Sequence, residues 1–191
     1  WGHNGFGSGT LGLGDDENRG DEPGEMGDNL PAVDLGSGRT ATALAAGSGH
    51  TCVILDTGAV KCWGDNLFGQ LGIGSFGDVR GAAPGQMGDN LPTVALGTGR
   101  TATAISAGPQ HTCALLDNAA VKCWGRNNVA QLGAGDDDDR GGTPAGMGDN
   151  LPVVALVTGL TACCVATSVS ATCARLDDVS VKCCWANDYG Q

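Results

Sequence analysis

Residues 50–64 have the sequence HTCVILDTGAVKCWG, which specifies a local structure more clearly than any other part of the chain. Two apolar, β-branched runs flank the short turn at residues 56–58, and such runs favour β-strands. Gly58 stands where a three-residue hairpin loop needs a left-handed backbone. In this register Cys52 lies directly opposite Cys62. The stretch therefore predicts a tight antiparallel hairpin.

The same sequence returns at intervals of about sixty residues, as expected for a repeat architecture. The string MGDNLP begins at Met26, Met87 and Met147, which are spacings of 61 and 60 residues. The hairpin strings HTC and VKCWG return in the second unit and, altered to ATC and VKCCWA, in the third. We predict three repeats and regard the third as degenerate. Their predicted boundaries are 1–62, 63–123 and 124–191.

Within each unit the periodicity is that of strands rather than helices. The second unit contains four short runs, LPTVAL, TATAISA, HTCALL and AVKCW, bounded by Gly, Pro, Asn or Asp. Glycine supplies 34 of the 191 residues, which favours tight turns. We predict an all-β fold of β-propeller blades, each a four-stranded antiparallel sheet. Because propellers close with about four to eight blades, we expect three units to be part of a larger propeller or assembly.

Charge and hydropathy exclude two classes of partner. Ten basic and 21 acidic residues give a net charge of −11, which disfavours binding to nucleic acid. No apolar run approaches the roughly 18–20 residues that cross a bilayer, so we expect no membrane span.

The hairpin and the glycine-rich string after it resemble the regulator of chromosome condensation repeat family. The resemblance rests on residues 49–64, Asn66 and 69–74, and on the corresponding strings from His111 to Gly135. It implies a propeller, usually of about seven four-stranded blades. The cysteine-bearing hairpin and the MGDNLP insert are similar to a secreted or surface branch of the family. In relatives the matched residues build blades and are not catalytic.

The repeat cysteines form three pairs with nine residues between the members. The pairs are Cys52 with Cys62, Cys113 with Cys123, and Cys173 with Cys183. Opposed positions on antiparallel strands have Cβ atoms about 4.5–5.5 Å apart, which a disulfide can bridge after a small adjustment. Reduced core thiols and a metal site are the alternatives, but zinc favours cysteines about two to four residues apart. We favour disulfides and therefore an extracellular or cell-surface location.

Three further cysteines fall outside the repeat pattern. Cys163 and Cys164 replace Thr103 and Ala104, and Cys184 falls opposite a gap when the units are aligned on tryptophan. Cys184 could close an additional bridge with Cys163 or Cys164, which would leave one thiol over. The third unit would then be a specialised end blade.

Two histidines and two tryptophans recur at fixed places. His50 and His111 each follow a tight turn, and no acid or nucleophile lies beside them in sequence other than Thr and Cys. We expect each histidine to have a structural role and to bind backbone across two blades. Trp63 and Trp124 mark the same phase of the repeat, and we expect them to build the blades.

A second recurrent feature is an arginine with an aspartate. Arg39 and Arg100 lie in Gly-Ser/Thr-Gly-Arg-Thr turns, and Asp28 and Asp89 lie in the MGDNLP strings. Since Arg geometry favours paired bonds to a carboxylate, we predict that these ion pairs fasten each insert to its own blade.

The acidic loops suggest calcium, but only weakly. Residues 15–22 and 136–139 supply hard oxygen ligands, yet neither has the alternating spacing of a calcium loop. A solvated run of charge explains them better, and we expect no cofactor.

We expect no enzymatic activity, because the sequence contains no nucleophile–base pair, phosphate loop or metal-ligand spacing. The favoured function is an extracellular structural or scaffold module in a fibre, wall or surface appendage. It would assemble through blade and loop contacts with other copies or adjoining repeats. The alternative is a soluble propeller that binds another surface protein or a glycan. A small-GTPase exchange role, as in the nuclear founder of the family, is disfavoured by the charge and the cysteines.

Overall fold

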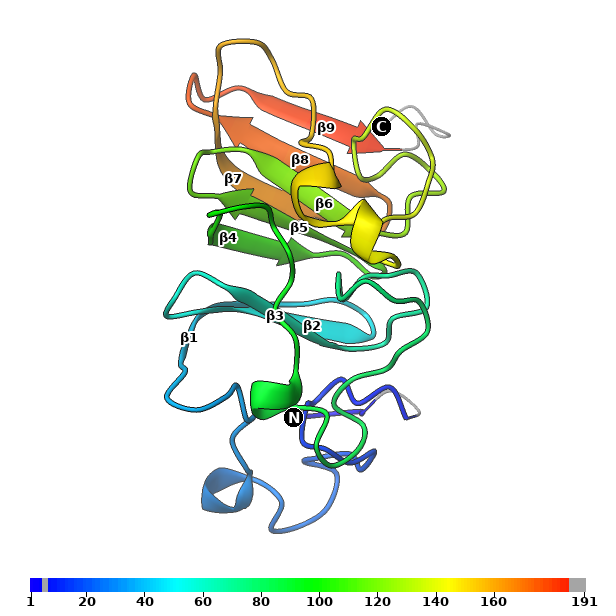
Figure 1. Cartoon of the computed structure of the whole chain (residues 1–191). Coiled ribbons are helices and arrows are strands. Elements are labelled where there is room, and N and C mark those ends of the chain that lie inside the picture. Colours follow the sequence, from blue (N-terminus) through cyan, green and yellow to red (C-terminus); the bar gives the residue numbers. More distant parts are fainter. Residues whose placement is uncertain (5–6, 186–191) are drawn as a thin grey trace.

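The computed structural model describes residues 1–4 and 7–185, which form three antiparallel sheets stacked along the chain (Figure 1). The first sheet contains β1 (Ala41–Ala46), β2 (His50–Leu55) and β3 (Val60–Gly64). The second contains β4 (Ala102–Ala107), β5 (His111–Leu116) and β6 (Val121–Gly125). The third contains β7 (Ala162–Thr167), β8 (Ala171–Leu176) and β9 (Val181–Trp185). In each sheet the strands follow chain order, so the predicted all-β fold is confirmed.

Helical structure within the described ranges is confined to short 3-10 turns in the inserts. They are η1 (Gly27–Asn29), η2 (Gly88–Asn90), η3 (Pro144–Gly146) and η4 (Gly148–Asn150). Three of them are formed by the Gly-Asp-Asn of an MGDNLP string, so the repeated string builds the same turn each time.

The hairpins have the register that the sequence predicts. Cys52 pairs with Cys62 across β2 and β3, and Leu55 N–H donates to the Ala59 carbonyl at 2.8 Å. Gly58 closes the first turn at a φ of 77°. The other two turns keep the same shape although Ala119 and Val179 adopt φ values of 62° and 63°. A β-branched residue is rare in this region, so the third turn is strained.

The prediction of four strands in each blade was wrong in detail. The string LPTVAL at 91–96 lies beside β3 but makes one isolated bridge, between Thr93 and Lys61. Val94 N–H donates to the Val60 carbonyl at 2.8 Å, and the pairing ends there. Pro92 lacks an N–H, so the segment cannot continue a regular ladder. Each sheet therefore has three regular strands, and in the first two sheets a loosely attached outer segment lies beside the third strand.

The sheets pack face to face; β2 and β3 of the first sheet are buried like the strands of the middle sheet, whereas β1 and much of the third sheet are exposed. In the middle sheet Val121 and Cys123 are 1% and 3% exposed. Val181, the third-sheet counterpart of Val121, is 60% exposed, and Cys183 is also exposed. At the opposite end of the stack Leu44 on β1 is 70% exposed. The stack thus has two open faces, which we call the β9 face and the β1 face.

Candidate functional site: the contacts between repeats

Each hairpin carries one disulfide that faces the following repeat. The structure joins Cys52 to Cys62, Cys113 to Cys123 and Cys173 to Cys183, with Cα atoms 4.1, 4.1 and 4.0 Å apart. The first two disulfides lie in hydrophobic clusters formed with residues of the next sheet. The third belongs to the β9 face and has no following sheet over it in the described chain. The disulfides are therefore part of the packing between repeats.

A tryptophan and a threonine from each of the first two sheets bind one carbonyl in the preceding loop. Trp124 Nε1 and Thr112 Oγ1 both donate to the Gln70 carbonyl oxygen, each at 3.0 Å. Trp63 Nε1 and Thr51 Oγ1 likewise donate to the carbonyl of Thr10, at 3.0 and 3.1 Å. We call this arrangement the carbonyl clasp. The sequence marked the tryptophans as blade residues but missed their threonine partners, although the Thr of HTC and ATC recurs in every unit.

The third clasp is altered because Cys184 replaces the tryptophan. Thr172 Oγ1 donates to the Gln131 carbonyl at 2.8 Å, whereas Cys184 Sγ lies 3.6 Å from the same oxygen. Cys184 pairs with Thr172 across β8 and β9 just as Trp124 pairs with Thr112 across β5 and β6. Cys184 is therefore no insertion opposite a gap, and that part of the sequence alignment was wrong.

Both repeated histidines are buried between sheets. His50 Nε2 lies 2.8 Å from Thr112 Oγ1, and His111 Nε2 lies 3.1 Å from Thr172 Oγ1. Each histidine bonds a threonine hydroxyl of the next sheet, and His111 also has a contact with the Ala171 backbone, of the kind that the sequence suggested. Since Thr112 gives its one hydroxyl proton to the Gln70 carbonyl, His50 Nε2 carries the hydrogen of their bond.

Burial governs the protonation of these histidines. It lowers the pKa of His50 from 6.5 to about 4, with a smaller contribution from the charge of His111. Burial likewise lowers the pKa of His111 to about 4, partly opposed by a hydrogen bond to the Ala171 backbone. Both rings are neutral at physiological pH, and their contacts are those of structural residues.

The predicted arginine–aspartate pairs were wrong. Arg39 pairs with Asp56 at 3.3 Å and Arg100 with Asp117 at 3.4 Å, rather than with Asp28 and Asp89. Asp56 and Asp117 stand at the hairpin turns, where their backbone N–H groups bind the residue that precedes each first strand. The arginines therefore fasten the turn to the start of its own sheet.

The insert aspartates instead connect neighbouring repeats. The Asp89 carboxylate accepts bonds from Ser37 N–H at 3.0 Å and from Ser37 Oγ at 2.6 Å. Asp149 accepts the same pair from Thr98, at 2.9 and 2.6 Å. These hydrogen bonds hold the pKa of both carboxyl groups below the usual value. Each insert is thus bound to the turn of the unit before it.

A lysine completes this connection. Lys61 Nζ donates to the carbonyl oxygens of Leu35 and Gly88, at 2.9 and 2.7 Å. Lys122 Nζ makes the corresponding bond to the Gly148 carbonyl at 2.7 Å. Burial lowers the pKa of Lys122. The lysines of VKCWG therefore hold the inserts, a role that sequence reasoning did not assign.

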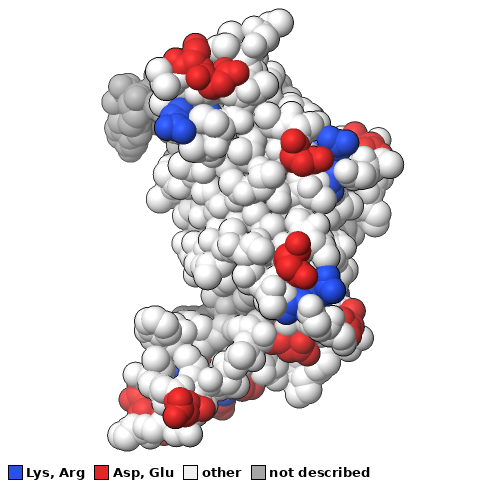
Figure 2. Space-filling view, turned by 90° about the vertical axis from the view of Figure 1, so that its left-hand side faces the viewer, with Lys and Arg blue, Asp and Glu red and all other residues white. Residues whose placement is uncertain are grey.

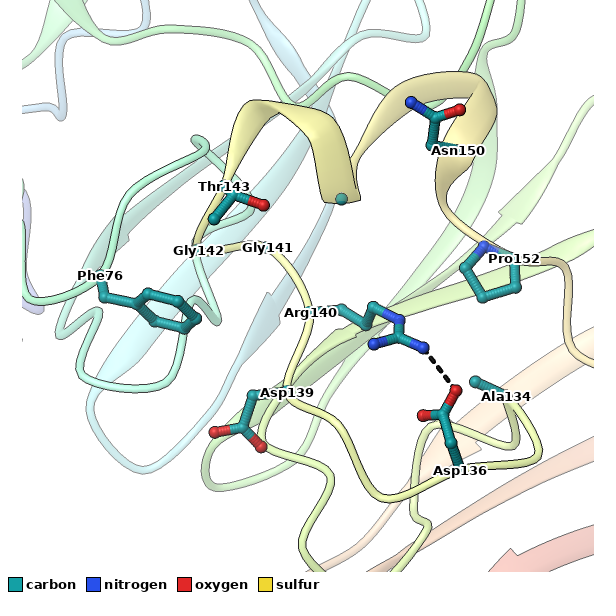
Figure 3. Close-up of a pocket in the computed structure, with 11 residues that line it drawn as sticks. Phe76, Ala134, Asp136, Asp139, Arg140, Gly141, Gly142, Thr143, Asn150 and Pro152 are labelled. Carbon is teal, nitrogen blue, oxygen red and sulfur yellow. Dashed lines mark hydrogen bonds and ion pairs between the residues drawn. The ribbon is translucent and has the colours of Figure 1, made fainter.

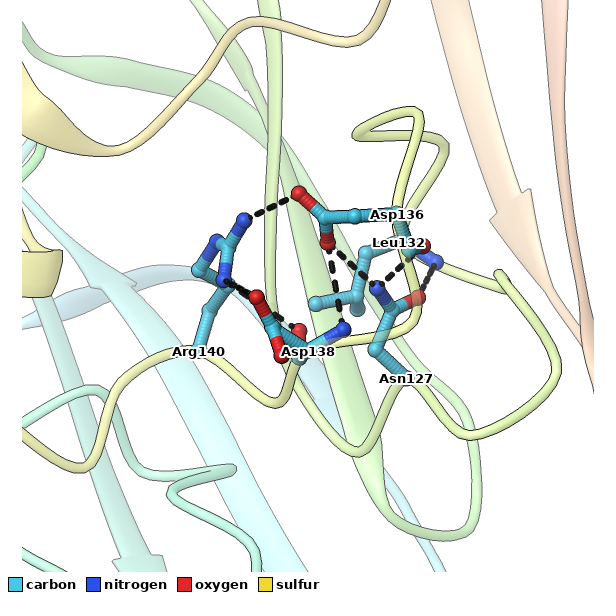
Figure 4. Close-up of polar contacts among 5 residues, drawn as sticks. All are labelled: Asn127, Leu132, Asp136, Asp138 and Arg140. Carbon is cyan, nitrogen blue, oxygen red and sulfur yellow. Dashed lines mark hydrogen bonds and ion pairs between the residues drawn. The ribbon is translucent and has the colours of Figure 1, made fainter.

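The acidic runs are internally bonded. Arg140 binds the carboxylate of Asp136, while Asn127 Nδ2 donates to the Asp136 carbonyl at 2.9 Å (Figure 4). Asn127 Oδ1 in turn accepts the Leu132 N–H at 2.9 Å. Figure 2 shows that on one side of the molecule acidic groups lie next to basic groups at several places, and that uncharged surface separates these places. Within residues 1–4 and 7–185, no three His, Cys, Asp or Glu side chains are grouped to hold a metal ion.

A hollow of about 420 Å³ lies over this loop (Figure 3). Phe76 from the preceding repeat forms one wall, and Arg140, Asn150 and Pro152 form others. The Arg140 guanidinium is ion-paired directly with Asp136 in the lining of the hollow, so its charge is already partnered. Nothing in this arrangement resembles a catalytic group aligned with a base.

The predicted additional disulfide was wrong. Cys163, Cys164 and Cys184 are free thiols. The first two lie on β7 and the third on β9, with β8 between them. Two strand spacings are about 9.5 Å, beyond the Cα separation of about 4.4–6.8 Å that a disulfide needs.

Comparison with known protein families gives matches within the first two hairpins and the segments around them. A model described as the regulator of chromosome condensation (RCC1) repeat matches residues 41–70 and 102–131, and a second with the same description matches residues 57–115. The probable E3 ubiquitin-protein ligase HERC4 of Homo sapiens is 33% identical over 97 residues, which are 51% of this chain and 8% of that protein. The ultraviolet-B receptor UVR8 of Arabidopsis thaliana is 31% identical over 97 residues, 51% of this chain and 20% of the receptor. The chain thus spans a small part of these relatives.

Solved structures share the fold at lower identity. Human WBSCR16 superposes with a TM-score of 0.62 at 16% identity, over 91% of this chain and 40% of that one. Yeast RCC1 (Prp20), in its complex with Kap60, gives a TM-score of 0.55 at 20% identity, over 75% of this chain and 31% of that one. No helix in the described part of the chain is long and apolar enough to cross a membrane.

Proposed function

This chain belongs to the regulator of chromosome condensation (RCC1) repeat family, and we propose that it is a non-catalytic, extracellular scaffold module that assembles through its open blade faces. RCC1-type propellers are generally binding modules. Three disulfides within one short chain indicate an oxidising environment, which supports a location outside the cell.

The observation that carries this proposal is the exposure of the two end faces. Val181 is 60% exposed, whereas its middle-sheet counterpart Val121 is 1% exposed. Leu44 is 70% exposed, whereas its counterpart Ile105 packs into the core between the first two sheets. Each open face therefore keeps the apolar residues that pack against another repeat inside the stack. Surfaces of this kind are association sites.

The two faces can pack against each other, because the corresponding surfaces of neighbouring sheets are in contact inside the stack. The β9 face is the surface that packs onto the next repeat in the first two sheets, and the β1 face is the surface that receives it. Their occupant is another repeat of the same kind, from a second copy or from an adjoining part of a longer chain. Contact between two different faces gives a head-to-tail arrangement, which either closes into a ring or extends as a filament.

The β9 face differs from the corresponding face of the middle sheet at one position that carries a charge. Arg175 is exposed at the position where the middle sheet has Leu115, which is 6% exposed. Its charge favours a partner that carries an acidic or polar group opposite it. With a net charge of −11, a second copy offers many such groups.

The proposed test is a sizing measurement on the purified 19.0 kDa chain over a range of concentrations. We expect the mean mass to rise above 19.0 kDa with concentration, and Val181→Asp or Leu44→Asp to reduce that rise. Leu67→Asp, at a loop position that is 61% exposed, is the matched control and should leave the rise unchanged. A mass that stays at 19.0 kDa at every concentration would contradict the proposal.

The second candidate is a soluble propeller that recognises another surface protein or a glycan. The hollow beside Phe76 and Arg140, with its volume of about 420 Å³, is the feature that favours it. A chain that remains a monomer but binds a surface protein or glycan, and loses that ligand on Phe76→Ala, would support this candidate over assembly.

A further inference from the structure

A small apolar cavity lies at the contact between the second and third sheets. Its volume is about 120 Å³. Its walls include Gly133, Val154 and Leu156 from the segments between β6 and β7, and Ala174 and Cys184 of the third sheet. The equivalent contact between the first and second sheets contains Trp124, whose side chain is completely buried.

The glycine beneath each clasp shows that the cavity stands in the place of an indole ring. A Cβ atom added to Gly72 would lie 2.8 Å from Trp124 Nε1, so the ring rests directly on that glycine. At Gly133, the counterpart of Gly72, the added atom would meet Cys184 Sγ at 3.0 Å. Gly133 therefore still provides the flat floor, but a single sulfur atom has replaced the ring.

Two apolar side chains in the cavity wall are more exposed than their counterparts in the preceding contact. Val94 and Leu96 beside Trp124 are 6% and 4% exposed. Their counterparts Val154 and Leu156 are only half-buried. These apolar side chains have lost the surface that would cover them.

We propose that this cavity binds an indole ring, which takes the position that Trp124 has in the preceding contact. The polar anchor is the Gln131 carbonyl oxygen, the counterpart of the Gln70 carbonyl that accepts both Trp124 Nε1 and Thr112 Oγ1. Gln131 accepts Thr172 Oγ1 at 2.8 Å and has only a thiol at 3.6 Å in place of the indole N–H. The site therefore selects a flat apolar ring with one N–H donor.

The size and chemistry of the cavity agree with this ligand. An engineered apolar cavity of about 150 Å³ takes up benzene, and this cavity of about 120 Å³ also opens to solvent, so a larger ring can extend toward its mouth. Burial raises the pKa of the Cys184 thiol. The sulfur is therefore uncharged at neutral pH and compatible with an aromatic face.

The first experiment measures the binding of indole and of 1-methylindole to the whole chain by calorimetry and NMR. We expect one indole per chain and weaker binding of 1-methylindole, which has no N–H to donate to Gln131. N-acetyltryptophanamide tests whether the ring can enter while attached to a peptide backbone. Binding of the amide would identify a tryptophan side chain as the ligand, and binding of indole alone would identify a small molecule.

Two substitutions localise the site. Cys184→Trp fills the cavity and should abolish binding, whereas Cys163→Ser, at an exposed thiol of the same sheet, should preserve it. Trp124→Cys should create an equivalent cavity and raise the stoichiometry to two indoles. If that variant does not fold, protection of Cys184 in the unaltered chain is the second measurement. With indole at about ten times its dissociation constant, Cys184 alkylation should slow about tenfold while Cys163 reacts as before.

Absence of saturable indole binding would overturn the proposal. Binding that survives Cys184→Trp, or equal affinity for 1-methylindole, would also overturn it.

Discussion

The two buried histidines predict that acid loosens the contacts between repeats well above the pH at which carboxylates titrate. His50 and His111 have pKa values lowered from 6.5 to about 4, mainly by burial. In the unfolded chain both rings take up a proton near pH 6.5, and in the folded chain they resist it until about pH 4. The unfolded state therefore binds more protons between these values, and the stability that is present above pH 6.5 is lost as the pH falls.

The size of the effect follows from the two pKa values. A fall from 6.5 to about 4 corresponds to about 3 kcal/mol for each ring over the whole window. Between pH 7.5 and pH 5 each ring should lose about 2 kcal/mol, so the pair should lose about 4 kcal/mol. Stopping at pH 5 keeps the measurement above the range in which Asp89 and Asp149, with their lowered pKa values, begin to protonate.

The assay is urea unfolding at several pH values between 5 and 7.5, with the disulfides intact. His50→Gln and His111→Gln lower stability at every pH because each loses a buried contact, but each should also remove about half of the pH dependence. The slope, and not the absolute stability, is therefore the informative quantity. A free energy of unfolding that is flat from pH 7.5 to pH 5, or an unaltered slope in the double variant, would show that the two histidines do not cause the pH dependence.

Three other predictions concern the disulfides, the clasp and the turn. Under mild reduction, differential alkylation should detect Cys173–Cys183 opening before Cys113–Cys123, because only the former lies on an open face; simultaneous opening would contradict this. Trp124→Ala should cost about 3–5 kcal/mol in urea unfolding, as for other buried large-to-small changes, and a cost below about 1 kcal/mol would refute the clasp as a stabilising contact. Val179→Gly should raise the free energy of unfolding by about 1 kcal/mol by relieving a β-branched residue at positive φ, and Ala119→Gly should raise it less.

The parts of the structure that the sequence predicted are local. The hairpin register follows from turn length and from the position of Gly58, so the opposition of Cys52 and Cys62 could be derived from a few neighbouring residues. The all-β class follows from short alternating runs bounded by turn residues. Neither inference needs knowledge of what lies across the molecule.

The parts that were missed depend on tertiary context. From the sequence alone, more than one aspartate could pair with Arg39, and only the folded structure shows that Asp56 is its partner. The prediction of a fourth strand was wrong because regular pairing beside β3 depends on the conformation of the insert that contains the segment. Cys184 was misaligned because the letter W was matched in place of the backbone register, which sets Cys184 opposite Thr172. The clasp was invisible since its acceptors are backbone carbonyls.

Hydrogen exchange compared between dilute and concentrated protein tests whether the two end faces bind another repeat. We expect amides of β9 and β1 to exchange more slowly at high concentration, while those of β5, already covered on both sides, should not change. Val181→Asp should remove the protection from both strands together, because the contact joins one face to the other. Exchange at β9 and β1 that is independent of concentration, or protection confined to the insert loops, would contradict this expectation.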